Sequence, residues 1–457
     1  MDIAVIFIYF LVLVFIGSRS FQIVKGINGF FVADRSAPFA FVTGSLFATI
    51  IGGSATIGMA GLGYRQGLVG SWWLLVGAIG LFLLGLFWAE KVRAYSLYTL
   101  PEILEVQYGP EAKLLASVLI VIAWMGIIAG QIVAAGRILE VIWSAPASVL
   151  MLITGCVFIL YTLLGGQYSV VRTDTIQSLI IVIAILVAIP LCLGKVGGVL
   201  LMREALGHDY FSFPVSQQFT GRTLATYLFL VGSTYVVGPD IYSRLFCAGD
   251  KKAARGATMT VALALIPFAF SITMVGMSAR VLFSGISPEA SFPTMITHVF
   301  PIGVSGLVIA ALLSAVMSSA DTCLLTTSTI LSVDVIRAFL RPAISERSLL
   351  SLSRFLIVVI GVFSLFLALR LKGVIPSLLL GYTVYTSGLV FPVLLGFYRD
   401  RLGVRREGAI LAMLAGGGLA LMGKLMGLRD FGLYGFFLSG VTLIIGSWVV
   451  ALVKGRN

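Results

Sequence analysis

Residues 310–328 read AALLSAVMSSADTCLLTTS, which places hydroxyl side chains and one aspartate inside an otherwise apolar segment. If the segment is helical, Ser318, Ser319 and Thr322 share one face, and Asp321 lies beside that face. Each hydroxyl could simply bond to the carbonyl one turn earlier, as a lone serine in a helix does. Several hydroxyls together with a carboxylate instead predict a functional site, because an ionisable group inside a membrane is costly.

The composition of the chain indicates a membrane environment. Of its 457 residues, 59% are hydrophobic and 11% are charged, whereas a soluble domain is about 25% charged. Apolar runs of roughly 18 or more residues recur, and each is long enough to cross ~30 Å of hydrocarbon. No loop exceeds roughly 30 residues, which is below domain size. We therefore predict an all-α polytopic membrane protein with a single domain over residues 1–457.

About thirteen membrane spans are predicted. The first is preceded only by Met1 and Asp2. It lacks the basic region and cleavage site of a signal peptide, so we expect it to remain in the protein. The predicted spans cover residues 3–23, 41–62, 70–90, 114–136, 148–164, 174–194, 222–243, 256–281, 302–333, 352–370, 375–398, 408–427 and 432–453.

The net charge of +12 is explained by the membrane. If the N-terminus is outside, most of the 31 Lys and Arg residues fall on the cytoplasmic side, which is the positive-inside bias. This predicts an N-out/C-in, multi-pass protein of the cell (cytoplasmic) membrane. The lipid bilayer accounts for the basic loops, so no nucleic-acid partner is predicted, and no obligate protein partner is evident. The cytoplasmic clusters are Arg244, Lys251, Lys252 and Arg255; Arg337, Arg341 and Arg347; and Arg399, Arg401, Arg405 and Arg406.

Cysteine and histidine are too few and too scattered for most enzyme chemistry. The four cysteines lie in or beside predicted spans without metal-ligand spacing, so no disulfide framework is predicted. The two histidines, His208 and His298, lie in predicted extracellular loops. A catalytic triad or transition-metal site has almost no residues from which to be built, and we do not predict an enzyme.

Two predicted spans contain helix-breaking residues. Residues 47–64, FATIIGGSATIGMAGLGY, carry the Gly52-Gly53-Ser54 sequence in mid-span, with further glycines after it. Adjacent mid-span glycines weaken a helix by roughly 1 kcal/mol each, which favours a break. The later glycines could equally serve close packing between helices.

The second interrupted span is LFLVGSTYVVGPDIYSR, residues 228–244. Its Gly238-Pro239 pair removes a backbone donor and disturbs the preceding turn. Broken helices at corresponding positions of two halves are the best sequence pointer to a transporter's midplane site. The halves would be an inverted repeat of spans 2–6 (residues 41–194) and spans 7–11 (residues 222–398), with an extra N-terminal span (3–23) and two extra C-terminal spans (408–453).

Carbonyl oxygens freed at the Gly52-Gly53 break could face the serines of residues 310–328. Hydroxyl and carbonyl oxygens with little competing water suit a hard cation, as in the all-oxygen ligand sets of calcium and magnesium. Sodium is therefore the ion predicted on physical grounds.

Three segments resemble the sodium/solute symporter family. Residues 165–177, GGQYSVVRTDTIQ, are similar to the family pattern GG-x3-V-x2-TD and are the most specific of the three. Residues 310–328 match the A-x2-S-[ST] sodium helix. The third is IIGGSATIGMAGLGY (residues 50–64), followed later by YSRLFCAGDKKAARGA (residues 242–257). The resemblance implies a leucine-transporter-like fold of five plus five helices in an inverted repeat.

The resemblance also implies a principal sodium site between the second and ninth spans. Ala48, Ile51 and Ala315 would provide backbone oxygens, and Ser318 and Ser319 would provide hydroxyls.

Some members of the family bind a second sodium ion, and the positions implied here are Asp174, Asp321 and Thr322. Asp174 would also line the route by which sodium leaves to the cytoplasm. Asp321 departs from the serine of those members, so it could instead titrate a proton or pair with a nearby arginine.

The substrate is less well specified. Sugar-transporting members of the family carry an acid and an amide after the break, where this chain has Ser54 and Ala55; proline-transporting members have an aspartate where it has Ile50. Exposed amides of Gly52, Gly53 and Ser54 at the start of a half-helix favour an anionic group. This predicts a small monocarboxylate or amino acid. Further predicted pocket residues are Gln131, Thr234, Tyr235, Tyr382 and Tyr385, although the last two could serve ordinary packing or interfacial anchoring.

Together these features predict a Na+-coupled secondary active symporter that imports a small organic solute by alternating access. Two alternatives stay open: an H+-coupled symporter, with Asp174 and Asp321 carrying protons, and a transporter-like sensor that acts through a partner. A channel is disfavoured because the polar side chains gather at one depth.

Overall fold

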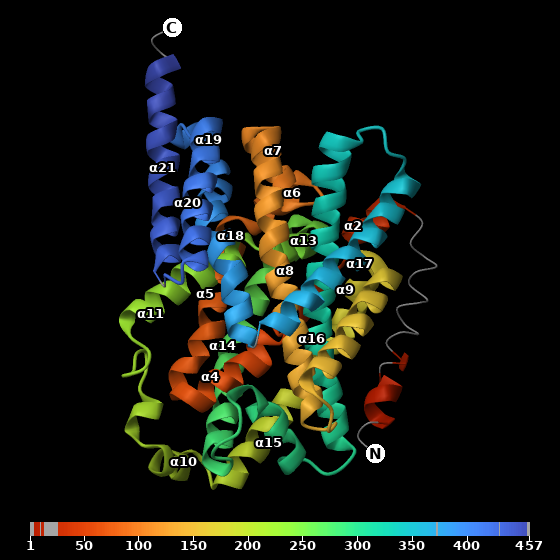
Figure 1. Cartoon of the computed structure of the whole chain (residues 1–457), viewed down its shortest axis with the longest axis vertical. Helices are drawn as coiled ribbons and strands as arrows, with labels where there is room; N and C mark the ends of the chain where they lie inside the picture. The colour runs from red at the N-terminus through yellow and green to blue at the C-terminus, as the bar shows by residue number, and fades with distance from the viewer. Residues whose placement is uncertain (1–3, 10, 13–25, 372, 429, 455–457) are drawn as a thin grey trace.

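The computed structural model describes residues 4–9, 11–12, 26–371, 373–428 and 430–454. Within these ranges the chain is helical, and its only β-type pairing is a single bridge between Ala37 and Ala248. Figure 1 shows the helices packed as one bundle, with α20 and α21 side by side at one edge. The predicted all-α class agrees with this architecture.

The first part of the chain forms helices up to residue 196. In order they are α2 (Ile27–Val32), η1 (Ala33–Arg35), α3 (Phe39–Ile50), η2 (Ser54–Gly58), α4 (Met59–Gln66), η3 (Gly67–Ser71), α5 (Trp72–Phe87), α6 (Ala89–Tyr95), α7 (Leu100–Tyr108), α8 (Pro110–Glu140) and α9 (Ala147–Val196).

The second part begins with a short helix after α9. In order it contains α10 (Val199–Leu206), η4 (His208–Phe211), α11 (Gly221–Thr226), η5 (Tyr227–Gly232), α12 (Ser233–Val237), α13 (Pro239–Cys247), α14 (Lys251–Leu282), η6 (Pro288–Ala290), α15 (Ser291–Val299), α16 (Val304–Thr329), η7 (Ile330–Leu340), α17 (Glu346–Arg370), α18 (Val374–Gly396), α19 (Arg399–Leu402), α20 (Arg406–Leu425) and α21 (Phe431–Lys454).

Ten helical segments of the described chain are long and apolar enough to cross a membrane. The predicted fifth and sixth spans correspond to the two helical parts of α9, Ala147–Leu163 and Gly166–Val196, which are separated by the non-helical backbone of Gly166 (φ 59°, ψ −179°). The predicted first span, residues 3–23, lies mostly outside the described residues. The count of thirteen spans and the N-out/C-in orientation therefore stay predictions.

Both predicted helix breaks are present. α3 ends at Ile50, and Ile51 has a non-helical backbone (φ −79°, ψ 59°) before helix resumes at Ser54. In the second broken span, Gly232 stays helical and the interruption falls at Gly238 (φ −60°, ψ 123°). The position follows from Pro239, which has no amide proton to continue the ladder and starts α13 instead.

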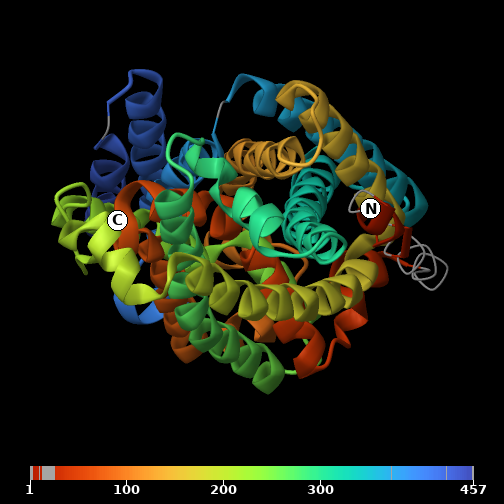
Figure 2. The same cartoon turned by 90° about the horizontal axis from the view of Figure 1, so that it is seen from below.

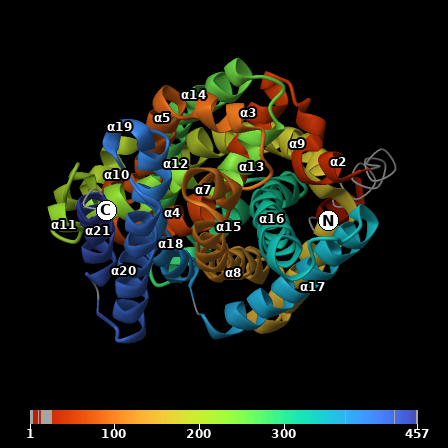
Figure 3. The ribbon, with the colours of Figure 1, turned by 90° about the horizontal axis from the view of Figure 1, so that it is seen from above.

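The helix that carries the polar stretch of residues 310–328 is the most enclosed of the bundle. The segment formed by α16 and η7 has 94% of its most apolar stretch buried, whereas the corresponding share for α21 is 28%. Figures 2 and 3, which view the bundle from its two ends, show α16 enclosed by α8, α9 and α17. The polar stretch therefore faces protein on all sides, whereas the outer helices expose apolar side chains.

Candidate functional site

The predicted ion site lies where the end of α3 meets the middle of α16. The Ser318 hydroxyl donates to the carbonyls of Ala48 (3.0 Å) and Ala315 (3.1 Å). The Ser319 hydroxyl donates to the carbonyls of Thr49 (2.7 Å) and Ala315 (3.2 Å). Each hydroxyl thus has one carbonyl partner in its own helix and one in α3. Three carbonyl and two hydroxyl oxygens converge in a fully enclosed place.

The carbonyls at the end of α3 are available because the helix stops there. In a continuous helix the Thr49 carbonyl would accept from the amide of Gly53. That amide instead donates to the Oε1 atom of Gln131, at 2.8 Å. Gln131 of α8, which was predicted to bind substrate, therefore also stabilises the break, because it occupies the amide that would otherwise continue α3.

Glycine is required at position 52 because α3 and α16 approach closely there. A Cβ atom at Gly52 would lie 2.2 Å from the Ser319 Oγ atom, closer than any ordinary contact. At Gly53 a Cβ atom would lie 2.4 Å from the Cβ of Ala134. The two glycines therefore provide the break and the close approach together.

Four of the five predicted sodium ligands are brought together directly. Ala48, Ala315, Ser318 and Ser319 are joined by hydrogen bonds. Ile51 is buried at the first residue of the break, but within the described chain no hydrogen bond links it to the serines. The carbonyl of Thr49, which was not among the predicted ligands, accepts from the Ser319 hydroxyl.

A small cavity of about 30 Å³ lies beside the ion site, with room for about one or two water molecules. Of the predicted substrate residues, five line it: Ser54, Gln131, Thr234, Tyr235 and Tyr382. The other lining residues are Thr49, Ile50, Ile127, Asp240, Ile241, Ser319 and Cys323.

Tyr385 does not line this cavity. Its hydroxyl donates to the carbonyl of Val237, and its ring packs edge-on against Trp124 with the ring centroids 4.8 Å apart. Val237 is the last residue before the second break. Tyr385 therefore satisfies a carbonyl at the end of α12, whereas the ring of Tyr382 stacks on Trp73 and reaches the cavity.

Arg244, predicted to belong to a cytoplasmic basic cluster, is instead fully buried. Its Nη2 atom lies 3.0 Å from the Oδ2 atom of Asp174, which also accepts from the Ser45 hydroxyl at 2.6 Å. The guanidinium further donates to the side-chain oxygens of Thr49, Gln167 and Thr322. The cluster prediction is wrong at this position because α13 directs Arg244 into the bundle, where a buried carboxylate balances its charge.

The two aspartates predicted for a second ion have different surroundings. Asp174 and Thr322 both bind Arg244. Asp321 is also buried, but its Oδ1 atom accepts from the Thr162 hydroxyl at 2.7 Å. Among the described residues Asp321 has no ion pair. The three residues predicted for a second ion therefore do not form one site. Asp174 and Thr322 bind Arg244, whereas Asp321 bonds to Thr162.

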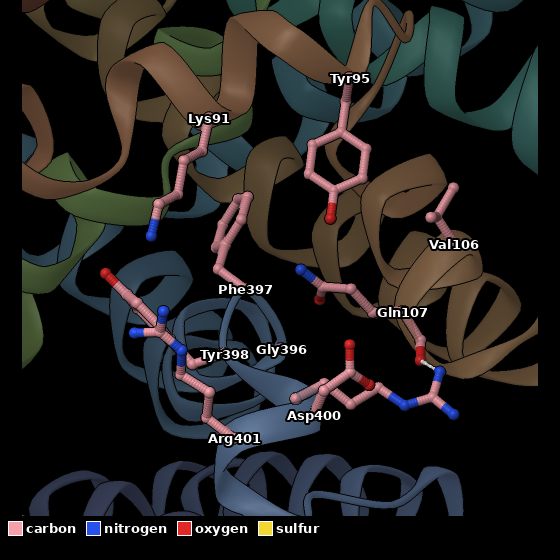
Figure 4. Close-up of a pocket in the computed structure, with 10 residues that line it drawn as sticks. Lys91, Tyr95, Val106, Gln107, Gly396, Phe397, Tyr398, Asp400 and Arg401 are labelled. Atoms are coloured by element: carbon pink, nitrogen blue, oxygen red, sulfur yellow. Dashed lines mark hydrogen bonds between the residues drawn. The ribbon is translucent and has the colours of Figure 1, made fainter.

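A wider hollow of about 450 Å³ lies at the surface between α6, α7 and the end of α18 (Figure 4). Lys91, Arg399 and Arg401 contribute charged groups, and the Lys91 Nζ atom lies 3.8 Å from the ring centroid of Tyr398. None of the residues predicted for ion or substrate binding lines this hollow. The small cavity at the two helix breaks is therefore the candidate binding site.

Comparison with known proteins agrees with this geometry. The model of the sodium:solute symporter family matches residues 30–416. The chain belongs to the sodium:solute symporter family. The family prediction is confirmed, and this symporter is a transporter, not an enzyme.

Two curated relatives illustrate the range of the family. The symporter is 27% identical to the osmoregulated proline transporter OpuE of Bacillus subtilis (strain 168), covering 97% of this chain and 93% of the relative. It is 25% identical to a sodium/glucose cotransporter of Vibrio parahaemolyticus, covering 88% of this chain and 80% of the relative. The substrates named for these relatives differ, so similarity alone does not give the substrate here.

Solved structures show the same fold. A substrate-bound, outward-open Na+-coupled sialic acid symporter superposes with a TM-score of 0.83 at 19% identity, covering 98% of each chain. MhsT in complex with L-phenylalanine superposes with a TM-score of 0.60 at 16% identity, covering 90% of this chain and 98% of that chain.

Proposed function

We propose that this symporter couples the entry of Na+ to the uptake of a small organic solute by alternating access. The observation that carries the proposal is the convergence of carbonyl oxygens from the end of α3 with the Ser318 and Ser319 hydroxyls of α16. Such a set of neutral oxygens, screened from water, suits a hard monovalent cation. The protein would act as a multi-pass protein of the cell membrane, oriented N-out/C-in.

Sodium would be held by the carbonyls of Ala48, Ile51 and Ala315 and by the hydroxyls of Ser318 and Ser319. In the structure each hydroxyl lies within hydrogen-bond distance of a carbonyl of α3. With Na+ bound, the hydroxyls would turn their lone pairs toward the ion. The ion would then fix the contact between α3 and α16 that the two hydroxyls now make by hydrogen bonds.

Solute would bind at the adjoining cavity once that cavity widens, because the cavity lies between the two broken helices and includes Ser319 in its lining. Ser319 is thus the side chain shared by the two sites. Any widening of the cavity that moves Ser319 also changes the ion site. This shared residue gives a direct physical basis for coupling.

The driving force of one sodium ion is sufficient for accumulation. One charge moving through about 100 mV contributes ~2.3 kcal/mol, and a roughly tenfold sodium gradient adds ~1.4 kcal/mol. Together these support a concentration ratio of roughly a few hundred-fold for a neutral or zwitterionic solute. An anionic solute would cancel the charge of a single ion and lose the electrical part.

We further propose a single sodium ion per cycle. Of the residues implied for a second ion, Asp174 and Thr322 already bind the guanidinium of Arg244. A sodium ion placed there would face a fixed positive charge at close range, which is strongly unfavourable in a low-dielectric interior. Arg244 therefore takes the electrostatic place of the second ion.

A proton-coupled symporter is a second candidate, favoured by one observation. Asp321 is buried and accepts a hydrogen bond only from Thr162 in the described chain. Thr162 has one hydroxyl hydrogen, yet its Oγ1 atom also lies 2.8 Å from the Phe158 carbonyl. If the hydrogen is directed to that carbonyl, Asp321 must donate, which requires a protonated carboxyl.

Uptake into proteoliposomes tests the proposal. Candidate solutes would be supplied with an inward gradient of Na+, of H+, or of neither, and each active compound repeated with Ser318→Ala/Ser319→Ala. We expect Na+-driven uptake that falls at least ~100-fold in the double variant, because two of the five predicted ligands are lost. Na+-dependent thermal stabilisation of the purified protein should disappear as well.

Thr327→Val is the matched control, because Thr327 is buried on the same helix and, among the described residues, its hydroxyl bonds only to the Cys323 carbonyl. It should retain Na+-driven uptake. Uptake that follows the proton gradient alone, and persists in the serine double variant, would refute sodium coupling and support the role of Asp321.

A further inference from the structure

The cavity contains an acidic side chain that the sequence pattern did not single out. Asp240 is the second residue of α13, directly after the break at Gly238 and Pro239. It lines the cavity together with Tyr235, Thr234 and Gln131. Its position at the interruption brings a carboxylate to the level of the broken helices.

The carboxylate of Asp240 has no hydrogen-bonded side-chain partner among the described residues. Its Oδ1 atom is buried and has no hydrogen-bond partner, and no ion pair in the described chain includes Asp240. Arg244, one turn further along α13, is already engaged by Asp174 and Thr322. The backbone amides of Asp240 and Ile241 at the start of α13 stabilise the carboxylate, but no side-chain donor reaches its Oδ1 atom. Such a group costs free energy until a donor reaches it.

Asp240 is also the one charged residue among the twelve that line the cavity. The others supply hydroxyls, one amide, one thiol and apolar surface. An anionic monocarboxylate would enter a cavity whose single charge repels it. A solute with a positively charged nitrogen would instead give Asp240 a charge-assisted hydrogen bond.

We propose that Asp240 binds the ammonium group of the solute, so that the transported class is amino acids or similar zwitterions rather than monocarboxylates. The inference rests on the proposed symport function. The opposite end of the zwitterion would face Ser54, on the first turn after the other break, where a helix start favours a carboxylate. The two broken helices thus present complementary charge to the two ends of an amino acid.

The test uses pairs of solutes that differ only in the nitrogen. Substrate-stimulated ²²Na+ influx into proteoliposomes would be measured for proline and cyclopentanecarboxylate, for alanine and propionate, and for the other natural amino acids with their deaminated analogues. Influx of ²²Na+ is used because it reports neutral and charged solutes alike. We expect stimulation by at least one amino acid and at least a ~10-fold weaker effect of its analogue.

The variant Asp240→Asn keeps the size of the side chain and removes its charge. We expect the half-saturating concentration of the amino acid to rise by about 10- to 100-fold. Sodium-dependent thermal stabilisation should stay unchanged, since Asp240 is not among the sodium ligands. Asp400→Asn, an exposed aspartate outside the cavity, is the control and should behave as the native protein.

The outcomes separate the two proposals. Influx stimulated only by compounds without the nitrogen, or an unchanged half-saturating concentration in Asp240→Asn, overturns the role of Asp240 while sodium symport stands. A native protein in which no compound stimulates Na+ influx overturns both. The comparison of matched solutes needs only the native protein, so it decides the question even if the variant fails to fold.

Discussion

At the scale of single residues, Arg244 connects more of the candidate site than any residue singled out from the sequence. Its guanidinium reaches Thr49 on α3, Asp174 and Gln167 on α9, and Thr322 on α16. Because it is fully buried, its positive charge and the negative charge of Asp174 depend on each other. Removing either one leaves the other without compensation.

This dependence predicts a non-additive pair of variants. Arg244→Gln alone should lower the stability of the protein by about 3–5 kcal/mol, because Asp174 becomes an unpaired buried charge. The double variant Arg244→Gln/Asp174→Asn should recover most of that loss. Thermal unfolding in detergent of the native protein, Arg244→Gln, Asp174→Asn and the double variant would measure the coupling. Equal losses for the single and double variants would contradict a charge-paired role.

The sequence reveals some residues of the site and conceals others for a physical reason. Ser318 and Ser319 could be predicted because hydroxyls inside an apolar helix are conspicuous. Arg244 could not, since an arginine near Lys251 and Lys252 at the end of a span looks like any positive-inside cluster. Asp240 was hidden in the same way, because an acid after a proline is the ordinary start of a helix.

At the scale of helices, glycines carry two functions that sequence alone does not separate. Gly52 breaks α3 and admits α16, whereas Gly232 remains within a helix. A Cβ atom at Gly80 of α5 would lie 2.2 Å from the Gly232 carbonyl. Gly232 therefore lies where two helices pack closely, and the break is at Gly238, as predicted from the Gly238-Pro239 pair. Only the packing of α5 against the segment around Gly232 shows that Gly232 is a packing glycine, whereas Gly52 is at a helix break.

The contact of α3 with α16 predicts a strong effect of one added methyl group. Gly52→Ala would place a Cβ atom 2.2 Å from the Ser319 hydroxyl oxygen, so the helices must separate or Ser319 must turn away. We expect a loss of about 1–3 kcal/mol in stability from overpacking and the loss of Na+-dependent stabilisation. Differential scanning fluorimetry with and without Na+ would measure both.

Gly418→Ala in α20 is the control for this prediction. A Cβ atom there has no neighbour within 4 Å, so the variant should be neutral or slightly stabilising, because alanine favours helix over glycine. A Gly52→Ala protein with native sodium response would show that the α3–α16 contact does not form the ion site.

At the scale of the whole molecule, the arrangement of charges predicts the coupling ratio. On the proposed mechanism, the described residues provide one sodium site made of neutral oxygens, and Arg244 would take the place of a second cation. We expect one Na+ to enter per solute molecule, with a Hill coefficient of 1 for sodium. The ratio of ²²Na+ influx to labelled solute influx would measure it. A ratio of two would show that Arg244 leaves the second position during transport.

The general architecture could be predicted from hydropathy, because a long apolar run in a membrane has to form a helix. The composition therefore indicated an all-helical membrane protein, and the family segments indicated the fold. The path of each helix after its break could not be predicted in this way. The placement of Tyr385 at the Val237 carbonyl, away from the cavity, depends on how α18 packs against α12.

The buried arginine also has a consequence for leakage. On the proposed route, a sodium ion that leaves Ser318 and Ser319 toward Asp174 meets a guanidinium tethered to α13. This attached charge cannot diffuse away as a free ion does, so it opposes any other cation until α13 itself moves. Sodium slipping through without solute would have to displace a part of the protein backbone. Arg244, which balances the charge of Asp174, would thus also prevent sodium leakage across the membrane when no solute is bound.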